Sequence, residues 1–309
     1  MKQNTLWKTL ALCLVCTFLW GAGYPVLKLS YSHWGIAPGD VPAKLLFAGI
    51  RFSVAGLILL LAASLRRKAF ARPESPKQVV ILGLFQTALQ YSFTYIGLAL
   101  TSGSKSSVLN QMSVFLVVLL TPLLLKKERL TQGKLLGCLL GFGGILVMNL
   151  EGLSLRLEIG DWFVLGASAF AAAGYLISKA MPKSADALTS TAWQQLTGGV
   201  MLLVAGLLTG GKLNSISLPG AGSLLFLILA AAISYSLWFY LLQHNDVGRI
   251  SVSKFLTPIF GVVFSGLLLG EPVFTPENGI ALALVCAGII TVNYTDRVPH
   301  RRAGACSRR

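Results

Sequence analysis

Two cationic side chains stand inside long apolar stretches of the sequence. Arg51 lies in the stretch 43–64, roughly 12 Å along a helix at 1.5 Å per residue, and Lys254 lies in the stretch 249–270. A charge in apolar surroundings is costly unless it faces a cavity, a partner or water. Each cation therefore either faces a cavity, where it attracts an acidic group, or avoids the apolar interior. Avoidance means snorkelling of Lys254 toward water, or hydrogen bonding of Arg51 to helix-end carbonyls.

Uncharged polar and aromatic side chains recur in several of the same apolar stretches. Gln86 and Gln90 are one helical turn apart, as are Tyr91 and Tyr95 on an adjoining face. Any single aromatic residue has the alternative of core packing or an interfacial position. As a set, they predict a pocket with aromatic walls and amide donors for a small amphipathic solute. The candidate substrate-binding residues are Trp20, Tyr24, Arg51, Gln86, Gln90, Tyr91, Tyr95, Asn110, Gln111, Tyr175, Tyr235, Trp238 and Lys254.

Groups for acid–base, metal or nucleophilic chemistry are missing from the middle of these stretches. Acidic residues fall at their ends, and the histidines fall in loops or in the C-terminal tail. Cys13 and Cys16 have redox-motif spacing, but they lie within one uninterrupted apolar helix. We therefore expect no catalytic residues, no metal, no cofactor and no enzyme activity. Without a buried carboxylate to relay protons, transport is expected to run by exchange or down the solute gradient.

The composition identifies the environment of these residues. Hydrophobic residues make up 54% of the 309-residue chain and charged residues only 12%, about half the charged share of a soluble domain. Such a chain is a membrane protein, and its scattered basic residues do not form a nucleic-acid-binding face, despite a net charge of +15. A membrane-crossing helix needs about 20 apolar residues. Ten candidates satisfy this: 7–29, 43–64, 77–99, 104–125, 131–150, 160–180, 188–209, 219–243, 249–270 and 275–295.

The loops predict the orientation of the chain in the membrane. Lys and Arg concentrate in the loops on the side of the N-terminus, which include Arg66-Arg67-Lys68 and Lys126-Lys127. Because cytoplasmic loops carry the excess of Lys and Arg, both termini are expected in the cytoplasm, with the protein in the cell (inner) membrane. The basic tail 297–309 then lies on the cytoplasmic side.

The two halves of the chain resemble each other. At an offset of 144, Tyr91-Ser92 matches Tyr235-Ser236 and Ser107-Val108 matches Ser251-Val252, and Gly23-Tyr24 matches Gly174-Tyr175 at an offset of 151. Residues 1–150 and 151–296 then each form a five-helix repeat. An odd number of crossings inverts the second repeat, so the fold class is all-α with ten transmembrane helices in two inverted five-helix repeats. Such repeats place a binding site near the membrane midplane.

Several short motifs, in order along the chain, resemble the EamA-type branch of the drug/metabolite transporter superfamily. The resemblance extends from Trp7 to Asn293, and its motifs are Trp20-Gly21 with Lys28, Arg51-Phe52, Glu128 with Leu130-Thr131, Pro258, and Glu271-Pro272. It implies export or exchange of small metabolites across a cytoplasmic membrane and does not identify the solute.

Glycine and proline mark the points where helices can bend. Gly23 and Pro25 weaken the first helix, and Pro258 weakens the ninth, so all three are candidate gating residues or static kinks. The sequence thus predicts a carrier that exports or exchanges a small metabolite, such as an amino acid or organic acid, by alternating access. The partners are this solute and the lipid bilayer, and the chain is a monomer or homodimer. The alternatives are a membrane-embedded enzyme or a channel.

Overall fold

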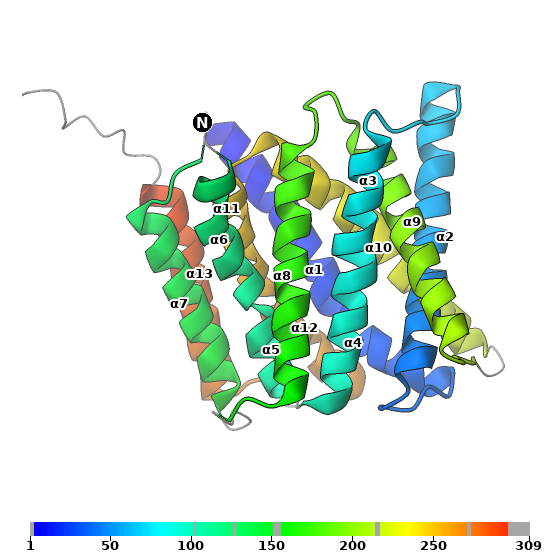
Figure 1. Ribbon diagram of the computed structural model, residues 1–309. Helices are drawn as coiled ribbons and strands as arrows, with labels where there is room; N and C mark the ends of the chain where they lie inside the picture. Colours follow the sequence, from blue (N-terminus) through cyan, green and yellow to red (C-terminus); the bar gives the residue numbers. More distant parts are fainter. Residues whose placement is uncertain are drawn as a thin grey trace, which may run out of the picture.

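The computed structural model describes residues 3–101, 103–125, 128–150, 156–213, 217–270 and 273–295. Within this part, the chain is a bundle of helices without strands (Figure 1). The helices are α1 (Gln3–His33), α2 (Val41–Arg67), α3 (Pro76–Gly83), α4 (Gln90–Leu100), α5 (Gly103–Asn110), α6 (Met112–Leu124), α7 (Gln132–Met148), α8 (Ile159–Ala180), α9 (Ala187–Leu208), α10 (Leu218–His244), α11 (Val247–Ser251), α12 (Leu256–Leu269) and α13 (Pro276–Thr295).

Several of these helices join end to end into single crossings. The crossings run Pro76–Leu100, Lys105–Leu124 and Val247–Leu269, and in the described residues 9 helices are long and apolar enough to span a membrane. The shorter apolar helix Gln132–Met148 is a further crossing; at 1.5 Å per residue it reaches about 25 Å. The chain is therefore an all-α polytopic membrane protein, as its composition predicts.

Helix ends are fixed by side chains at the predicted boundaries. Thr131 caps α7 by accepting a hydrogen bond from the backbone N–H of Lys134 at 3.2 Å. Thr275 accepts from the N–H of Asn278 at the start of α13 at 3.3 Å, with Pro276 at its first position. Each cap satisfies backbone donors that the helix itself leaves free.

The contacts between helices correspond in pairs between the two halves of the chain. In Figure 1, α7 and α13 lie side by side at one edge of the bundle and α2 and α9 at the other. The contacts of α1 with α10 and α12 correspond to those of α8 with α4 and α6. The pairs α2–α9 and α7–α13 each join equivalent helices of the two halves. The two halves therefore enclose one interior between them.

Glycines at the edge formed by α7 and α13 show this symmetry in detail. A Cβ on Gly137 would lie 2.7 Å from the carbonyl oxygen of Gly288, and a Cβ on Gly144 would lie 2.8 Å from that of Ala281. These two contacts are related by the offset of 144 (281 − 137 and 288 − 144) that the sequence repeat shows. Glycine here lets the backbones of α7 and α13 meet, so these small-residue faces are used within the chain.

Both repeats also interrupt one crossing at corresponding positions. Gln111 separates α5 from α6, and a 3₁₀ turn at Val252–Phe255 separates α11 from α12. Residues 111 and 255 differ by the same offset of 144. These two interruptions bring irregular backbone and polar side chains to the middle of the bundle, which a membrane protein tolerates only where they line a cavity or are buried in protein.

Candidate functional site

A cavity of about 940 Å³ occupies the centre of the bundle, between the two repeats. Its lining runs from the middle of the bundle to the end opposite the N-terminus, where Met148, Asn149 and Glu277 contribute. Polar and aromatic side chains from α1, α2, α4, α5, α8, α10 and α12 line its deeper part. A volume of this size is ample for a metabolite.

The cavity gathers most of the residues singled out in the sequence. Its lining includes Trp20, Tyr24, Arg51, Gln90, Tyr91, Tyr95, Asn110, Gln111, Tyr175, Tyr235 and Lys254, together with Gly23 and Pro258 from the gating set. Pro25 lies next to this lining, within α1. Gln86 and Trp238 do not line the cavity.

Gln86 is buried outside the cavity. Residues Leu84–Leu89 form a π-helical turn between α3 and α4, and Gln86 lies within this turn. Gln86 instead packs on α8, where a Cβ on Gly174 would lie 2.6 Å from the Gln86 Cβ.

Trp238 lies behind the wall of the cavity. Its side chain is fully buried, and its ring is 5.0 Å from that of Trp20 and 5.7 Å from that of Tyr175 between centroids. Both neighbours line the cavity. Trp238 therefore supports two lining rings from α1 and α8 through edge-to-face and tilted contacts.

Arg51 faces the cavity from α2. Its guanidinium lies over the ring of Phe52 at 4.2 Å and near that of Tyr91 at 5.5 Å. The side chain is only 7% exposed, and its buried Nε has no hydrogen-bond partner among the described residues. In the described part of the chain, no carboxylate forms an ion pair with Arg51. The aromatic faces offset only part of the cost of burying this cation. The guanidinium can therefore still bind an anion.

Lys254 faces the same cavity from the other repeat. It lies in the 3₁₀ turn Val252–Phe255, and its Nζ donates to the Ser113 hydroxyl at 3.1 Å, just beyond the interruption of the matching crossing. The ammonium is also 5.2 Å from the centroid of the Tyr175 ring. Of the two placements that the sequence leaves open, facing a cavity or snorkelling toward water, the structure shows Lys254 facing the cavity.

Aromatic rings connect the surroundings of the two cations. The hydroxyls of Tyr91 and Tyr235 are hydrogen-bonded at 2.9 Å, and the ring of Trp20 is 5.8 Å from that of Tyr235. Within the part of the chain that the structure describes, other buried lining groups have no hydrogen-bond partner, namely Gln90 Oε1, Tyr95 Oη, Ser106 Oγ, Gln111 Oε1 and Thr257 Oγ1. Buried polar groups normally have partners, so this lining is suited to water or a polar solute.

A cluster of four charged residues lies at the end of the bundle that carries the N-terminus. Lys134 Nζ lies 2.6 Å from Asp246 Oδ2, and Lys179 Nζ lies 3.4 Å from Glu128 Oε1. The carboxylate of Glu128 also accepts a hydrogen bond from the backbone N–H of Val247 at 2.9 Å. These contacts join the first repeat to the second. We call Glu128, Lys134, Lys179 and Asp246 the charged cluster.

The environment of Glu128 alters its protonation. Burial raises the pKa of Glu128 above its ordinary value, and the neighbouring carboxylate of Asp246 raises it further. The hydrogen bond from Val247 and the charges of Lys179 and Lys134 oppose this rise without cancelling it. Glu128 therefore binds a proton more readily here than a carboxyl group in water does.

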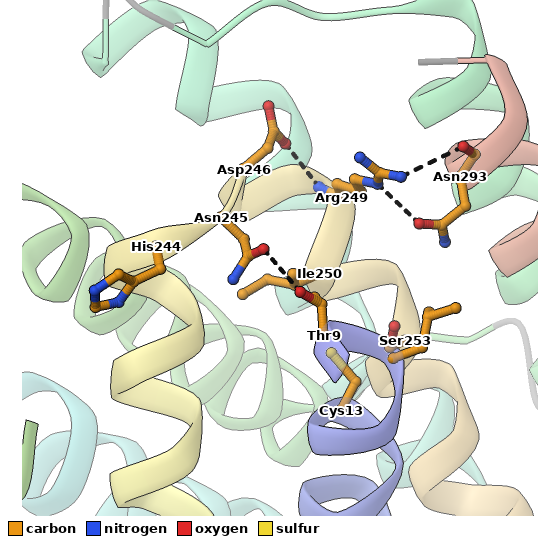
Figure 2. Close-up of a pocket in the computed structure, with 10 residues that line it drawn as sticks. Thr9, Cys13, His244, Asn245, Asp246, Arg249, Ile250, Ser253 and Asn293 are labelled. Atoms are coloured by element: carbon orange, nitrogen blue, oxygen red, sulfur yellow. Dashed lines mark hydrogen bonds between the residues drawn. The ribbon is translucent and has the colours of Figure 1, made fainter. Parts of the chain in front are cut away.

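A second, smaller pocket of about 150 Å³ lies beside the charged cluster. Figure 2 shows it between α1 and the segment 244–253, with Arg249 and Asn293 facing each other at one edge and Cys13 on the opposite side. Arg249 Nε donates to Asn293 Oδ1 at 2.8 Å, and Thr9 Oγ1 donates to Asn245 Oδ1 at 3.1 Å.

At the opposite end, an ion pair joins the repeats beside the cavity mouth. Lys105 on α5 contacts Asp161 on α8 at 2.5 Å, and Asp161 also accepts from Thr101 Oγ1 at 2.6 Å and from the Glu158 N–H at 2.7 Å. These three contacts give Asp161 a structural role.

Some of this site was not identified from the sequence. Thr94, Ser106, Thr257 and Ser265 line the cavity, and Glu128 with Lys179 belongs to the charged cluster. The matched pairs Ser107-Val108 and Ser251-Val252 could have pointed to these lining residues, since the pairs lie beside the interruptions of the two corresponding crossings. The partners of Glu128 had no such signal, because they come from distant parts of the chain.

The fold and the cavity define a polytopic membrane protein built to hold a small solute, and comparisons with known proteins specify its class. The sequence profile of the EamA-like transporter family matches residues 7–150 and again 158–294. The chain belongs to this family, and it is a membrane transporter.

Curated relatives carry similar descriptions. The uncharacterized transporter YvbV of Bacillus subtilis is 28% identical over 96% of this chain and 95% of its own length. A probable amino-acid metabolite efflux pump of Salmonella typhimurium is 28% identical over 93% of this chain and 95% of its own length. A crystal structure with a TM-score of 0.77 and 19% identity covers 94% of this chain and 98% of its own chain, which supports the fold.

Proposed function

We propose that this transporter is a secondary carrier that exports or exchanges a small metabolite with an acidic group, such as an amino acid or organic acid. The observation that carries the proposal is the pair of cations in the cavity. Arg51 and Lys254 both line it, and in the described residues neither forms an ion pair with a carboxylate. In a low-dielectric chamber, a solute anion gains strongly from such uncompensated charge.

The proposed mechanism is alternating access across the cytoplasmic membrane. With the N-terminus in the cytoplasm, the cavity opens toward the outside and the charged cluster closes the inside. The corresponding helix contacts of the two halves support a second conformation in which the two ends exchange roles. Gly23 and Pro258 in the lining, and Pro25 beside it, are the proposed flexible points. The proposed driving force is exchange or the solute's own gradient.

Counterflow in proteoliposomes tests this function. Vesicles containing the purified protein are loaded with unlabelled amino acids or organic acids, and uptake of the labelled solute is measured. We expect saturable counterflow for an anion, whereas a channel would give flux without counterflow and an enzyme would release a product.

Charge-neutralising variants test the role of the cations. Arg51→Gln and Lys254→Gln should reduce anion counterflow at least tenfold, in proportion to the loss of a charge-assisted contact of about 1.5–3 kcal/mol. The flux of cationic solutes should change much less. Lys212→Gln removes an exposed lysine outside the cavity and is the matched control. Equal losses for anions and cations would contradict the proposal.

A further inference from the structure

The small pocket beside the charged cluster continues the line of the central cavity along two helices. On α1, Thr9 and Cys13 line the pocket, and Trp20, Tyr24 and Leu27 line the cavity. These residues follow one another at three-, four- or seven-residue steps, so they lie on one face of the helix. One continuous stripe of α1 therefore lines both spaces.

The second helix shows the same continuity. Ile250 and Ser253 line the pocket, and Lys254, Thr257 and Gly261 line the cavity. The 3₁₀ turn Val252–Phe255 lies where one lining passes into the other. The residue next to the cavity lysine thus belongs to the small pocket.

A thin buried layer separates the two spaces. Cys16, between Cys13 and Trp20 on the α1 stripe, is fully buried, and its Sγ lies 3.5 Å from the carbonyl oxygen of Ser234. Trp238, also fully buried, packs on Trp20. On α1, this layer is about two helical turns deep from Cys13 to Trp20.

The pocket shares a cation and uncharged polar groups with the cavity, and it also contains the carboxylate of Asp246, which pairs with Lys134. Arg249 supplies a cation at its edge, and Thr9, Asn245, Ser253 and Asn293 supply uncharged polar groups (Figure 2). Asp246 belongs both to this pocket and to the charged cluster. Opening of the cluster would therefore widen the pocket directly.

We propose that this pocket is the closed, cytosol-facing half of the solute path and a second binding site for the acidic group of the transported solute, with Arg249 as its cation. The volume of about 150 Å³ is below the roughly 300–1,000 Å³ of occupied ligand sites, as a closed vestibule requires. The inference rests on the proposed carrier function and adds a site that the central cavity does not contain.

Cys13 is a built-in reporter of this path. It lines the pocket but is only 1% exposed, so it reacts with thiol reagents only when the vestibule opens. The full chain is prepared with Cys13 as its sole cysteine, the other four being replaced by alanine or serine. Membrane vesicles of both orientations are treated with membrane-impermeant methanethiosulfonates, one with a sulfonate group and one with a trimethylammonium group.

The expected pattern has three parts. Cys13 reacts from the N-terminal side of the membrane and not from the other side. The sulfonate reagent reacts faster than the trimethylammonium reagent, and Arg249→Gln removes most of this difference. Modified protein loses counterflow, because the attached group blocks the path. A chain without its native cysteines that carries Lys183→Cys, at an exposed loop position on the N-terminal side, should show no effect of Arg249→Gln.

Contradictory outcomes separate the two proposals. Reaction of Cys13 from the opposite side, equal rates for both reagents, or full counterflow after complete modification would overturn the vestibule while leaving the carrier function intact. Absence of counterflow in the unmodified wild-type protein would contradict the carrier function itself.

Discussion

The N-terminal end of the bundle and the central cavity treat their charges in opposite ways. In the charged cluster, Lys134 and Lys179 each lie within 3.4 Å of a carboxylate. In the cavity, Arg51 contacts aromatic rings and Lys254 contacts a serine hydroxyl. Paired charges hold two repeats together, whereas a cation without a carboxylate partner attracts an anion from solution. The difference supports the proposed roles of the charged cluster as a closure and of the cavity as a binding chamber.

The largest expected effect comes from adding to the cavity a carboxylate such as those in the charged cluster. Gln111 lines the cavity and is only 4% exposed, and its Oε1 has no partner among the described residues. Gln111→Glu would add a carboxylate to the lining that also holds Arg51 and Lys254, which would offset their charge and repel an anionic solute. Anion affinity should fall on the order of a hundredfold, in line with coupling energies of close charges.

The measurement is the half-saturation concentration for counterflow. Gln111→Asn, which keeps the amide and adds no charge, is the control. Unchanged affinity in Gln111→Glu would show that this part of the cavity does not hold the anion.

The next largest effect is expected when one ion-pair partner is removed from the charged cluster. Lys134→Gln leaves Asp246 without its ammonium partner in a partly buried position. The conformation open at the N-terminal end should gain population about tenfold, because a lost charge-assisted contact shifts a two-state equilibrium by that order. Spin labels at the exposed positions Leu130 and Lys183 report the opening as a longer distance.

Arg66→Gln provides the control at the same end of the bundle. Arg66 pairs with Asp186, but its side chain is 55% exposed. Exposed pairs contribute little, so the label distances should not change. An equal shift in both variants would mean that any lost charge at this end loosens the bundle.

A smaller, pH-dependent effect should follow from Glu128. Its pKa is raised in the closed conformation, chiefly by burial and next by Asp246. A water-exposed Glu128 in the open conformation would regain its ordinary value. As pH falls through the interval between the two values, the closed conformation takes up a proton and the open one does not, so acid favours closure.

The same spin-label distances, measured across pH, check this prediction. Glu128→Gln should flatten the pH dependence because the group no longer titrates. A pH dependence that persists unchanged in Glu128→Gln would assign the effect to another group.

The smallest expected effect concerns hydrogen bonding within the chamber. Tyr235→Phe removes the 2.9 Å contact between hydroxyls while keeping the ring. Counterflow should slow about two- to tenfold, as for one neutral hydrogen bond. Tyr240→Phe on the same helix is the control, because Tyr240 is 44% exposed. Unchanged counterflow in Tyr235→Phe would show that Tyr235 acts through the packing of its ring and not through its hydroxyl.

The sequence by itself determined the crossings and the kinds of residue that meet in the cavity. Hydrocarbon offers no hydrogen-bond partners, so long apolar stretches had to be helices, and caps such as Thr131 depend on neighbouring residues alone. Arg51 and Lys254 were recognisable because a charge is expensive anywhere along such a stretch.

Only the tertiary structure decided which side of each helix faces the cavity and which distant charges meet. Gln86, within a π-helical turn, packs on α8, and the ring of Trp238 lies behind that of Trp20. Glu128 and Lys179 became partners across the repeats. A periodic pattern specifies a face only relative to its own helix, whereas the rotation of that helix and the approach of its neighbours follow from packing of the whole bundle.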